Sequence, residues 1–165
     1  MAVIEVRVTK IIAGGTEDAN DVLSESTSAG ADWDFGGVVD YNGVAGEIIG
    51  ALAISESESV VPSLTLFLFN AAPTGCNLND DAPNTAPDST DLANVIGSIN
   101  FPAMESIGTT DSMAVATPNT PNSHLPLPFK CALDSRTIYG VLATRTAFTQ
   151  TAGDDMTMVL LVRQL

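Results

Sequence analysis

The sequence predicts an all-β protein, a single β-sandwich domain of jelly-roll-like character with about eight to ten short antiparallel strands. Short apolar runs recur at the spacing typical of a sandwich or barrel. Glycine, proline, asparagine and aspartate separate these runs, and such residues favour turns. No long amphipathic helix pattern occurs, so we expect at most one short helical turn. The 165 residues suit one domain, because a chain of this size buries roughly 70% of its extended surface.

The N-terminal part is predicted to contain two strands separated by a polar segment. Apolar and polar residues alternate over residues 1–12, which is the period of a half-buried strand. Residues 13–31 are small, polar and acidic, and we expect a surface loop or an arm that lies on a neighbouring subunit. Trp33 and Phe35 then alternate with acids, so both rings belong on one face of the next strand, most simply in the core.

A turn and two further strands are expected before the middle of the chain. The dipeptide Asn42-Gly43 favours the positive φ values of a tight hairpin. Residues 46–54 are predicted to form a strand. The apolar run 63–69 predicts another strand that is buried on both faces.

The segment after this run is polar and acidic. Prolines exclude a regular strand within residues 77–91, because they lack an amide donor. We expect a short helical turn at the end of the segment, with Asp88 or Ser89 as its cap and Asp91 in its first turn, where negative charge is favoured.

The C-terminal half is predicted to hold the remaining strands. Four prolines between residues 118 and 128 restrict that segment to an edge or irregular strand. The other predicted strands are 95–101, 113–117, 137–145 and 156–164.

Charge is distributed unevenly along the chain, whose net charge is −14. The segment between Lys10 and Lys130 contains sixteen acids and no basic residue. An acidic body repels phosphate, so we expect no nucleic-acid binding. One interpretation of these acids is a solvated surface. The other is that the acidic middle of the chain faces solvent while the terminal strands face a partner. No apolar run approaches 18 residues, so we also expect no membrane span.

The sequence offers little for catalysis, and we expect no enzymatic activity. His124 is the only histidine and lies between prolines, which predicts a surface loop. No nucleophile elbow, phosphate-binding loop or dinucleotide fingerprint occurs. Cys76 and Cys131 could close a long loop, but a protein assembled in a reducing cytoplasm normally keeps such thiols free.

Oxygen-rich residues in the acidic segment make calcium the best small-ligand alternative. The candidate ligands Asp80, Asp81, Asp88 and Asp91 supply carboxylates. Their spacing differs from the standard calcium loop, and a turn-rich loop explains the same residues. We therefore expect no cofactor, with structural calcium as the alternative.

The order of the strands resembles the decoration or cement proteins of tailed bacteriophages, a family of small all-β proteins that coat the outside of the capsid. The resemblance covers the chain from about Trp33 onward. It rests on the Leu66-Phe67-Leu68-Phe69 strand, the loop from Asn79 to Asp81, Asp91-Leu92 before Val95-Ile96-Gly97, Ile138-Tyr139-Gly140-Val141-Leu142 and the closing strand 156–164.

This resemblance implies a virion structural protein, made in the host cytoplasm, that binds the major capsid protein on the outer capsid surface and stabilises the shell. It also implies a homo-oligomer, a trimer or a dimer. All basic residues lie near the ends of the chain, and we expect the terminal strands to face the capsid. The candidate interface residues are Arg7, Lys10, Arg136, Arg145 and Arg163.

Two other functions fit an all-β phage protein. One is a carbohydrate- or receptor-binding β-sandwich module of a fibre or tail, with Trp33, Tyr41 and Tyr139 as stacking residues. That function predicts exposed aromatic rings along a groove, whereas decoration predicts buried rings and a broad subunit contact. The other is a tail-tube or connector subunit, which would form closed rings.

Overall fold

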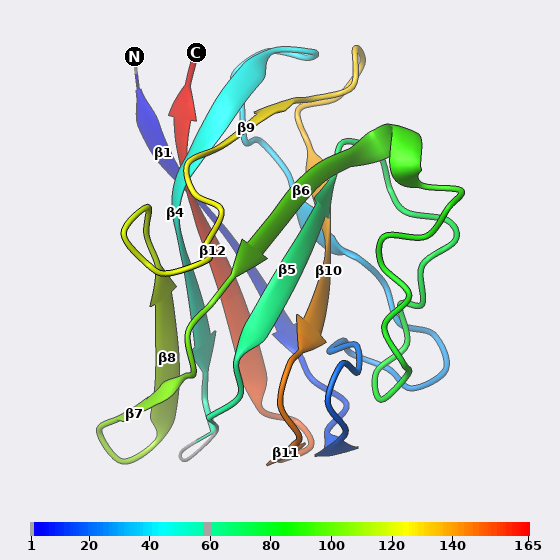
Figure 1. The fold of residues 1–165 in the computed structure, drawn as a ribbon, viewed down its shortest axis with the longest axis vertical. Coiled ribbons are helices and arrows are strands. Elements are labelled where there is room, and N and C mark those ends of the chain that lie inside the picture. The colour runs from blue at the N-terminus through cyan, green and yellow to red at the C-terminus, as the bar shows by residue number, and fades with distance from the viewer. Residues whose placement is uncertain (1, 58–60) are drawn as a thin grey trace.

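The computed structural model describes residues 2–57 and 61–165, and the fold is all-β (Figure 1). Met1, part of the predicted segment 1–12, lies outside the described residues. One short 3-10 turn, η1 (Leu92–Asn94), is the only helical element in the described part of the chain. The strands are β1 (Val3–Ile11), β2 (Gly15–Glu17), β3 (Trp33–Phe35), β4 (Ala45–Ser55), β5 (Leu64–Phe69), β6 (Val95–Asn100), β7 (Glu105–Ile107), β8 (Asp111–Ala116), β9 (Leu127–Lys130), β10 (Ile138–Thr144), β11 (Phe148–Gln150) and β12 (Asp155–Gln164).

Two antiparallel sheets pack face to face as a sandwich. The larger sheet has the order β1-β12-β4-β8-β7, and β9 pairs with β4 beyond β8. The smaller sheet has the order β3-β10-β5-β6. A separate two-stranded ribbon, β2 with β11, lies at the lower end of the sandwich in Figure 1. The two chain ends lie side by side at the opposite end, because β1 and β12 are antiparallel neighbours.

The strand order is that of a jelly roll. Four pairs of strands, β1 with β12, β3 with β10, β4 with β8 and β5 with β6, are each joined in antiparallel register. From the first pair to the last, the two strands lie closer and closer together in the sequence, so the chain resembles one long antiparallel ribbon that is folded over. Successive pairs belong alternately to the larger and the smaller sheet. The sandwich predicted from the sequence is therefore confirmed.

The core lies between the sheets and follows the alternation of each strand. Leu64, Leu66 and Leu68 of β5 are completely buried and face Met158 and Leu160 on the inner side of β12. The predicted burial of the 63–69 run on both faces is confirmed, since five residues of β5 are buried and one is half-buried. Trp33 and Phe35 are in the core, as their shared strand face predicted.

The outer face of the smaller sheet is covered by two loops, 13–32 and 70–91. Val22 from the first loop packs with Cys76 from the second loop, and both contact Phe69 and Val141 of the sheet. Leu23 is completely buried in the main core. The predicted loop 13–31 therefore packs on its own domain through these two side chains.

Two sequence predictions need correction. Asn42-Gly43 forms a turn with Gly43 at φ 70°, but it joins no hairpin, because β3 and β4 belong to different sheets. The helical turn is present, but Asp91 occupies the position before it and makes no capping side-chain bond. Its carboxylate is instead bonded to Thr74 and Gly75.

The strand count is also higher than predicted. The described residues contain twelve strands, and the predicted eight to ten missed β2, β7 and β11. Each of these has three residues, which is too short to show a period in the sequence.

Candidate functional site

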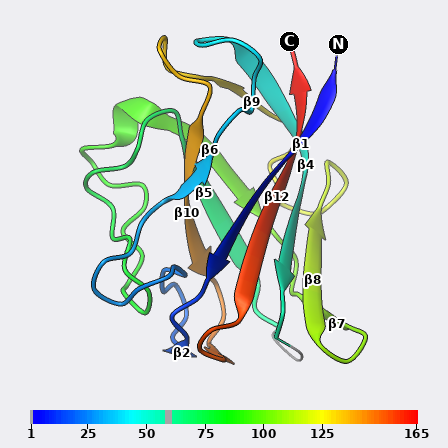
Figure 2. The same cartoon turned by 180° about the vertical axis from the view of Figure 1, so that it is seen from behind.

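The outer face of the larger sheet carries a cluster of apolar side chains, which we call the apolar patch. Its strands lie in front in Figure 2. Along each strand, side chains point alternately to the core and to this outer face. A residue that lies between two core residues of the same strand therefore belongs to the outer face. The apolar patch consists of Leu52, Ile54, Met113, Val115, Val159 and Leu161.

Strand register places these side chains in adjoining rows. Val159 of β12 is opposite Leu52 of β4, which is opposite Val115 of β8. Ile54 is opposite Met113 in the next row. Such directly opposed side chains are in contact across neighbouring strands. The apolar patch is therefore continuous over three strands.

The patch is partly accessible: Leu52, Ile54, Met113 and Leu161 are half-buried, and Val159 is buried. Val115 is 40% exposed, and nearby Ile107 on β7 is 39% exposed. A hollow of about 210 Å³ beside Met113 and Val115 is also lined by Pro102, Glu105 and Ile107. Contiguous apolar surface of this kind marks sites of protein interaction more often than scattered apolar residues do.

Charged side chains at the border of the patch are paired with each other. Arg7 Nη2 lies 2.7 Å from Glu5 Oε1 on β1. Arg163 Nη1 of β12 lies 2.8 Å from Glu47 Oε2 of β4. Each arginine thus has a carboxylate partner on the same outer face, whereas Glu105, directly opposite Met113, adds an acid to the border.

The other predicted interface residues lie elsewhere. Lys10 is bonded to Glu25 and to the carbonyl of Ala31, with its Nζ 5.4 Å from the centre of a ring of Trp33. Arg145 donates to Thr65 and Asn20 on the outer side of the smaller sheet.

The fifth predicted interface residue also lies away from the patch. Arg136 is in the loop between β9 and β10, 3.5 Å from the carbonyl of Asp40. The structure therefore brings Arg7 and Arg163 to one face and separates them from Lys10, Arg136 and Arg145.

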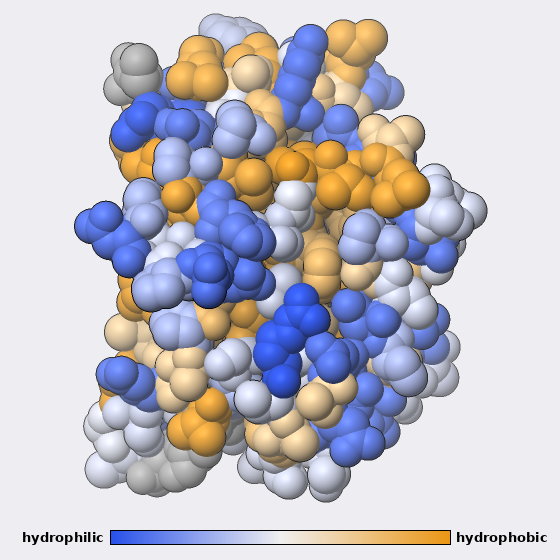
Figure 3. Space-filling view, viewed as in Figure 1, coloured by the Kyte–Doolittle hydropathy of each residue, from blue (hydrophilic) through white to orange (hydrophobic). Residues whose placement is uncertain are grey.

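A second apolar surface lies on the opposite side of the molecule. Figure 3 shows a hydrophobic band over η1 and the start of β6, which is the edge strand of the smaller sheet. Leu92 is 59% exposed and Val95 is 38% exposed. A hollow of about 330 Å³ lies between this strand and β9, and Ile96 and Pro128 are part of its lining.

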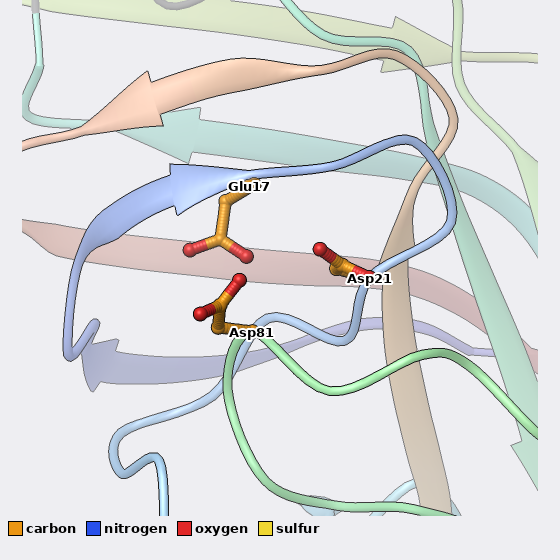
Figure 4. Close-up of side chains that lie close together, drawn as sticks. All are labelled: Glu17, Asp21 and Asp81. Carbon is orange, nitrogen blue, oxygen red and sulfur yellow. The ribbon is translucent and has the colours of Figure 1, made fainter.

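A cluster of carboxylates lies where the β2–β11 ribbon meets the two covering loops. Glu17 ends β2, Asp21 follows in the first loop and Asp81 comes from the second loop. One carboxylate oxygen from each residue lies within 4.8 Å of the other two. Figure 4 shows the three carboxylates turned toward one another. We call these three residues the acidic cluster.

Backbone contacts fix the acidic cluster. Asp21 and Pro83 form an isolated bridge between the two loops, and Asp81 N–H donates to the carbonyl of Val22. The Asp21 carboxylate also accepts the Asp18 N–H at 2.7 Å. The carboxylates therefore belong to segments that the fold joins firmly.

Buried polar atoms without a hydrogen-bond partner are concentrated at and beside the acidic cluster. Glu17 is completely buried, and neither of its carboxylate oxygens has a hydrogen-bond partner. Asp80 Oδ2 and both amide atoms of Gln150 are buried without a partner as well. Among the described residues, these three side chains hold every buried side-chain nitrogen or oxygen that lacks a partner. Buried polar groups are normally paired, so the concentration requires an explanation.

Electrostatics at Glu17 disfavour its charged form. Burial, reinforced by the carboxylates of Asp80, Asp81 and Asp21, raises the pKa of Glu17 to about 8. Burial likewise raises the pKa of Asp80. These are the effects expected where several acids share a site without a counter-charge.

The other two sequence-predicted calcium ligands serve the loop itself. Asp91 is 1% exposed and accepts the N–H groups of Thr74 and Gly75, both at 2.9 Å. Asp88 accepts the N–H and hydroxyl of Thr90. The structure thus places Asp81 in the acidic cluster, with Asp80 beside it, and separates Asp88 and Asp91 from it. Sequence reasoning missed Glu17 and Asp21, which carry no motif.

The predicted aromatic stacking residues do not form a groove. Trp33 is 1% exposed, and its Nε1 donates to the carbonyl of Leu23. Tyr41 is 75% exposed on a loop, and Tyr139 is half-buried on β10.

The remaining singled-out residues lie apart from both sites. His124 is exposed, with Nδ1 3.2 Å from the hydroxyl oxygen of Ser98. Cys76 and Cys131 are buried free thiols.

Comparison with known proteins adds little to this description. No protein-family model and no curated protein matches the sequence. A solved structure from Bacteroides thetaiotaomicron, of a protein whose name proposes sugar binding, aligns over 94% of this chain and 83% of its own chain. The identity is 10% and the TM-score is 0.28, so this likeness supports no argument about function. No described helix has the length and apolar character needed to cross a membrane.

Proposed function

We propose that this protein is a non-enzymatic structural protein of a phage virion that decorates the capsid by binding its protein subunits through the apolar patch. The observation behind the proposal is a partly exposed apolar surface over three neighbouring strands of a sandwich whose other outer face is covered by loops. Burying such a surface against another protein is favourable by about 25 cal/mol per Å². Paired charges at the border fit the polar rim of a protein interface.

The burial of Trp33 also favours decoration over glycan binding. A carbohydrate-binding module stacks sugars on exposed rings, and Trp33 contributes to the core instead. Decoration needs a broad contact, and contacts to several subunits reinforce one another through avidity. The partner in this proposal is the major capsid protein, and the oligomer is a dimer or a trimer. The start of β6, where Val95 is exposed at the edge of the smaller sheet, is the surface that best suits contact between copies, because its other end is bonded to residues 122–124.

The test is to add the purified protein to heads that lack it and to measure occupancy by electron microscopy. We expect ordered, saturable density at the local symmetry axes. Val115→Glu places a charge at the most exposed residue of the patch, and we expect occupancy to fall by at least about tenfold, because a charge buried unpaired in the interface costs several kcal/mol.

Leu133→Glu is the matched control, since Leu133 is 84% exposed in a loop outside both sheets. Binding of Leu133→Glu should equal that of the unaltered protein. Full occupancy by Val115→Glu would refute the role of the patch. Density at the tail tip or fibres, with none on heads, would support the carbohydrate- or receptor-binding alternative, and closed rings of the protein alone would support a tail-tube subunit.

A further inference from the structure

The acidic cluster lacks a counter-charge from the chain that surrounds it. Segments 13–32 and 70–91 supply nine acids and no lysine or arginine. The two basic side chains bonded to the first of these segments have other partners. Lys10 is bonded to Glu25 and Ala31, and Arg145 donates to Asn20 and Thr65. Several buried carboxylates without a counter-charge are strongly destabilising, so a positive charge is required for them to ionise together.

We propose that Glu17, Asp21 and Asp81 bind one Ca²⁺ ion. Carboxylates are the oxygen ligands that calcium prefers, at distances of about 2.3–2.6 Å. Two oxygens on opposite sides of such an ion are about 4.6–5.2 Å apart. The three oxygens of the acidic cluster lie within 4.8 Å of one another, which is inside the span of a single calcium coordination shell.

The unsatisfied atoms of the neighbouring side chains fit this proposal independently. Gln150 of β11 is paired with Gly15 of β2, and Glu17 is paired with Phe148. Gln150 and Glu17 are thus diagonal neighbours on one face of the ribbon. Residues in such positions are about 7–8 Å apart, so their long side chains can reach each other. A Gln150 oxygen and Asp80 Oδ2, both buried and unpaired, are the further oxygen donors at this place. Calcium takes six to eight oxygens, and water completes such a shell.

Calcium would connect three segments that are distant in sequence. Glu17 belongs to the β2–β11 ribbon, Asp21 to the first covering loop and Asp81 to the second. The two loops cover the outer face of the smaller sheet through Val22 and Cys76. Bound calcium therefore stabilises this cover, and the folded protein is stabilised by mass action because the unfolded chain lacks the site.

The experiment is thermal unfolding of the purified protein in EDTA and in about 10 mM Ca²⁺, a level above the dissociation constants of about 10⁻⁴–10⁻³ M of weak extracellular calcium modules. At 100 times the dissociation constant, calcium shifts the unfolding equilibrium about 100-fold. Such a shift raises the melting temperature by several degrees, and calorimetric titration should give one ion per chain. Equal melting temperatures in EDTA and Ca²⁺ would overturn the proposal and leave a protonated Glu17 as the explanation of the cluster. An equal response to Mg²⁺ would overturn the assignment to calcium.

The Glu17→Gln variant tests whether Glu17 is a calcium ligand or only fills buried space. In EDTA the variant should be at least as stable as the unaltered protein, because glutamine fills the same buried space without a carboxylate beside Asp21 and Asp81. In Ca²⁺ it should lose the increase, so the order of stability reverses. Asp34→Asn is the control, an exposed acid on β3 outside the cluster, and it should respond to Ca²⁺ as the unaltered protein does. A full calcium response in Glu17→Gln would refute the role of Glu17. The capsid-binding proposal is independent of these measurements, which use no capsids.

Discussion

Replacing Asp91 with asparagine is expected to destabilise the protein by about 2–4 kcal/mol. The Asp91 carboxylate is 1% exposed and connects the beginning of the covering loop 70–91 to its end. Oδ1 accepts the Thr74 N–H and Oδ2 accepts the Gly75 N–H, both at 2.9 Å. The Cys76 thiol donates to Oδ2 at 3.3 Å.

The magnitude follows from these contacts. Asparagine has one acceptor oxygen, so one of the two backbone N–H groups faces an NH₂ group and loses its bond. An unsatisfied buried donor costs about 1–3 kcal/mol, and the remaining bond weakens from a charged to a neutral one by about 1 kcal/mol. For a domain of this size each kcal/mol corresponds to roughly 2–4 °C, so we expect the melting temperature to fall by about 4–16 °C.

The effect should also depend on pH. The Thr74 N–H, followed by that of Gly75, stabilises the charged carboxylate and lowers the pKa of Asp91 from its usual value of 3.8. A group whose pKa is lower in the folded state stabilises the protein above its unfolded pKa, and this contribution is lost as the pH falls through the folded pKa. The stability difference between the unaltered protein and Asp91→Asn should thus be constant from pH 7 to about 5 and decrease below about pH 4.

Urea unfolding followed by tryptophan fluorescence is the appropriate assay, since Trp33 is the single tryptophan and is buried. Asp34→Asn is the control, because Asp34 is exposed on β3 and surface changes of this kind stay within about 0.5 kcal/mol. The reasoning fails if Asp91→Asn is no less stable than this control at pH 7. It also fails if the difference persists unchanged at low pH.

Two further predictions concern the core. Leu66→Ala removes a completely buried side chain between the sheets and should cost about 2–5 kcal/mol in urea unfolding; a loss below this range would mean that the sheets close over the cavity. Gly140→Ala should lower stability by about 1–3 kcal/mol, because its Cβ would lie 2.8 Å from Leu66 Cδ1 and 3.2 Å from Phe35 Cε2. An unchanged melting temperature for Gly140→Ala would show that these neighbours move without cost.

The sequence was sufficient where hydrophobic periodicity is strong. β5, β10 and β12 are apolar runs buried in the middle of sheets, and the alternation in β1 matches its half-buried edge position. β9 is an edge strand, one of the two forms its prolines allow, and pairs only with one end of β4. These features depend on local pattern, which a single sequence contains.

The pairing of segments that are distant in the sequence could not be predicted from local pattern. The Asn42-Gly43 turn has the positive φ of a hairpin turn, but the choice between joining strands of one sheet and of two depends on the whole topology. The acidic cluster is a similar case. Asp81 was selected for its oxygen-rich neighbours, whereas its partners, Glu17 at the end of β2 and Asp21 in the loop after it, belong to no motif. The pairing of β2 with β11 buries Glu17, and neither of these three-residue strands has a sequence signal.

The placement of the few basic residues explains how so acidic a chain keeps one face apolar. Nine acids lie in the two loops over the smaller sheet, where Lys10 and Arg145 each bond to residues of the first loop. On the larger sheet, Arg7 and Arg163 pair with glutamates at the border of the apolar patch. Negative charge is thus densest in the two covering loops, and the outer face of the larger sheet combines apolar rows with two paired arginines and fewer acids. This polarity suits the proposed attachment, because an apolar surface can then meet a capsid while the acidic loops stay in water.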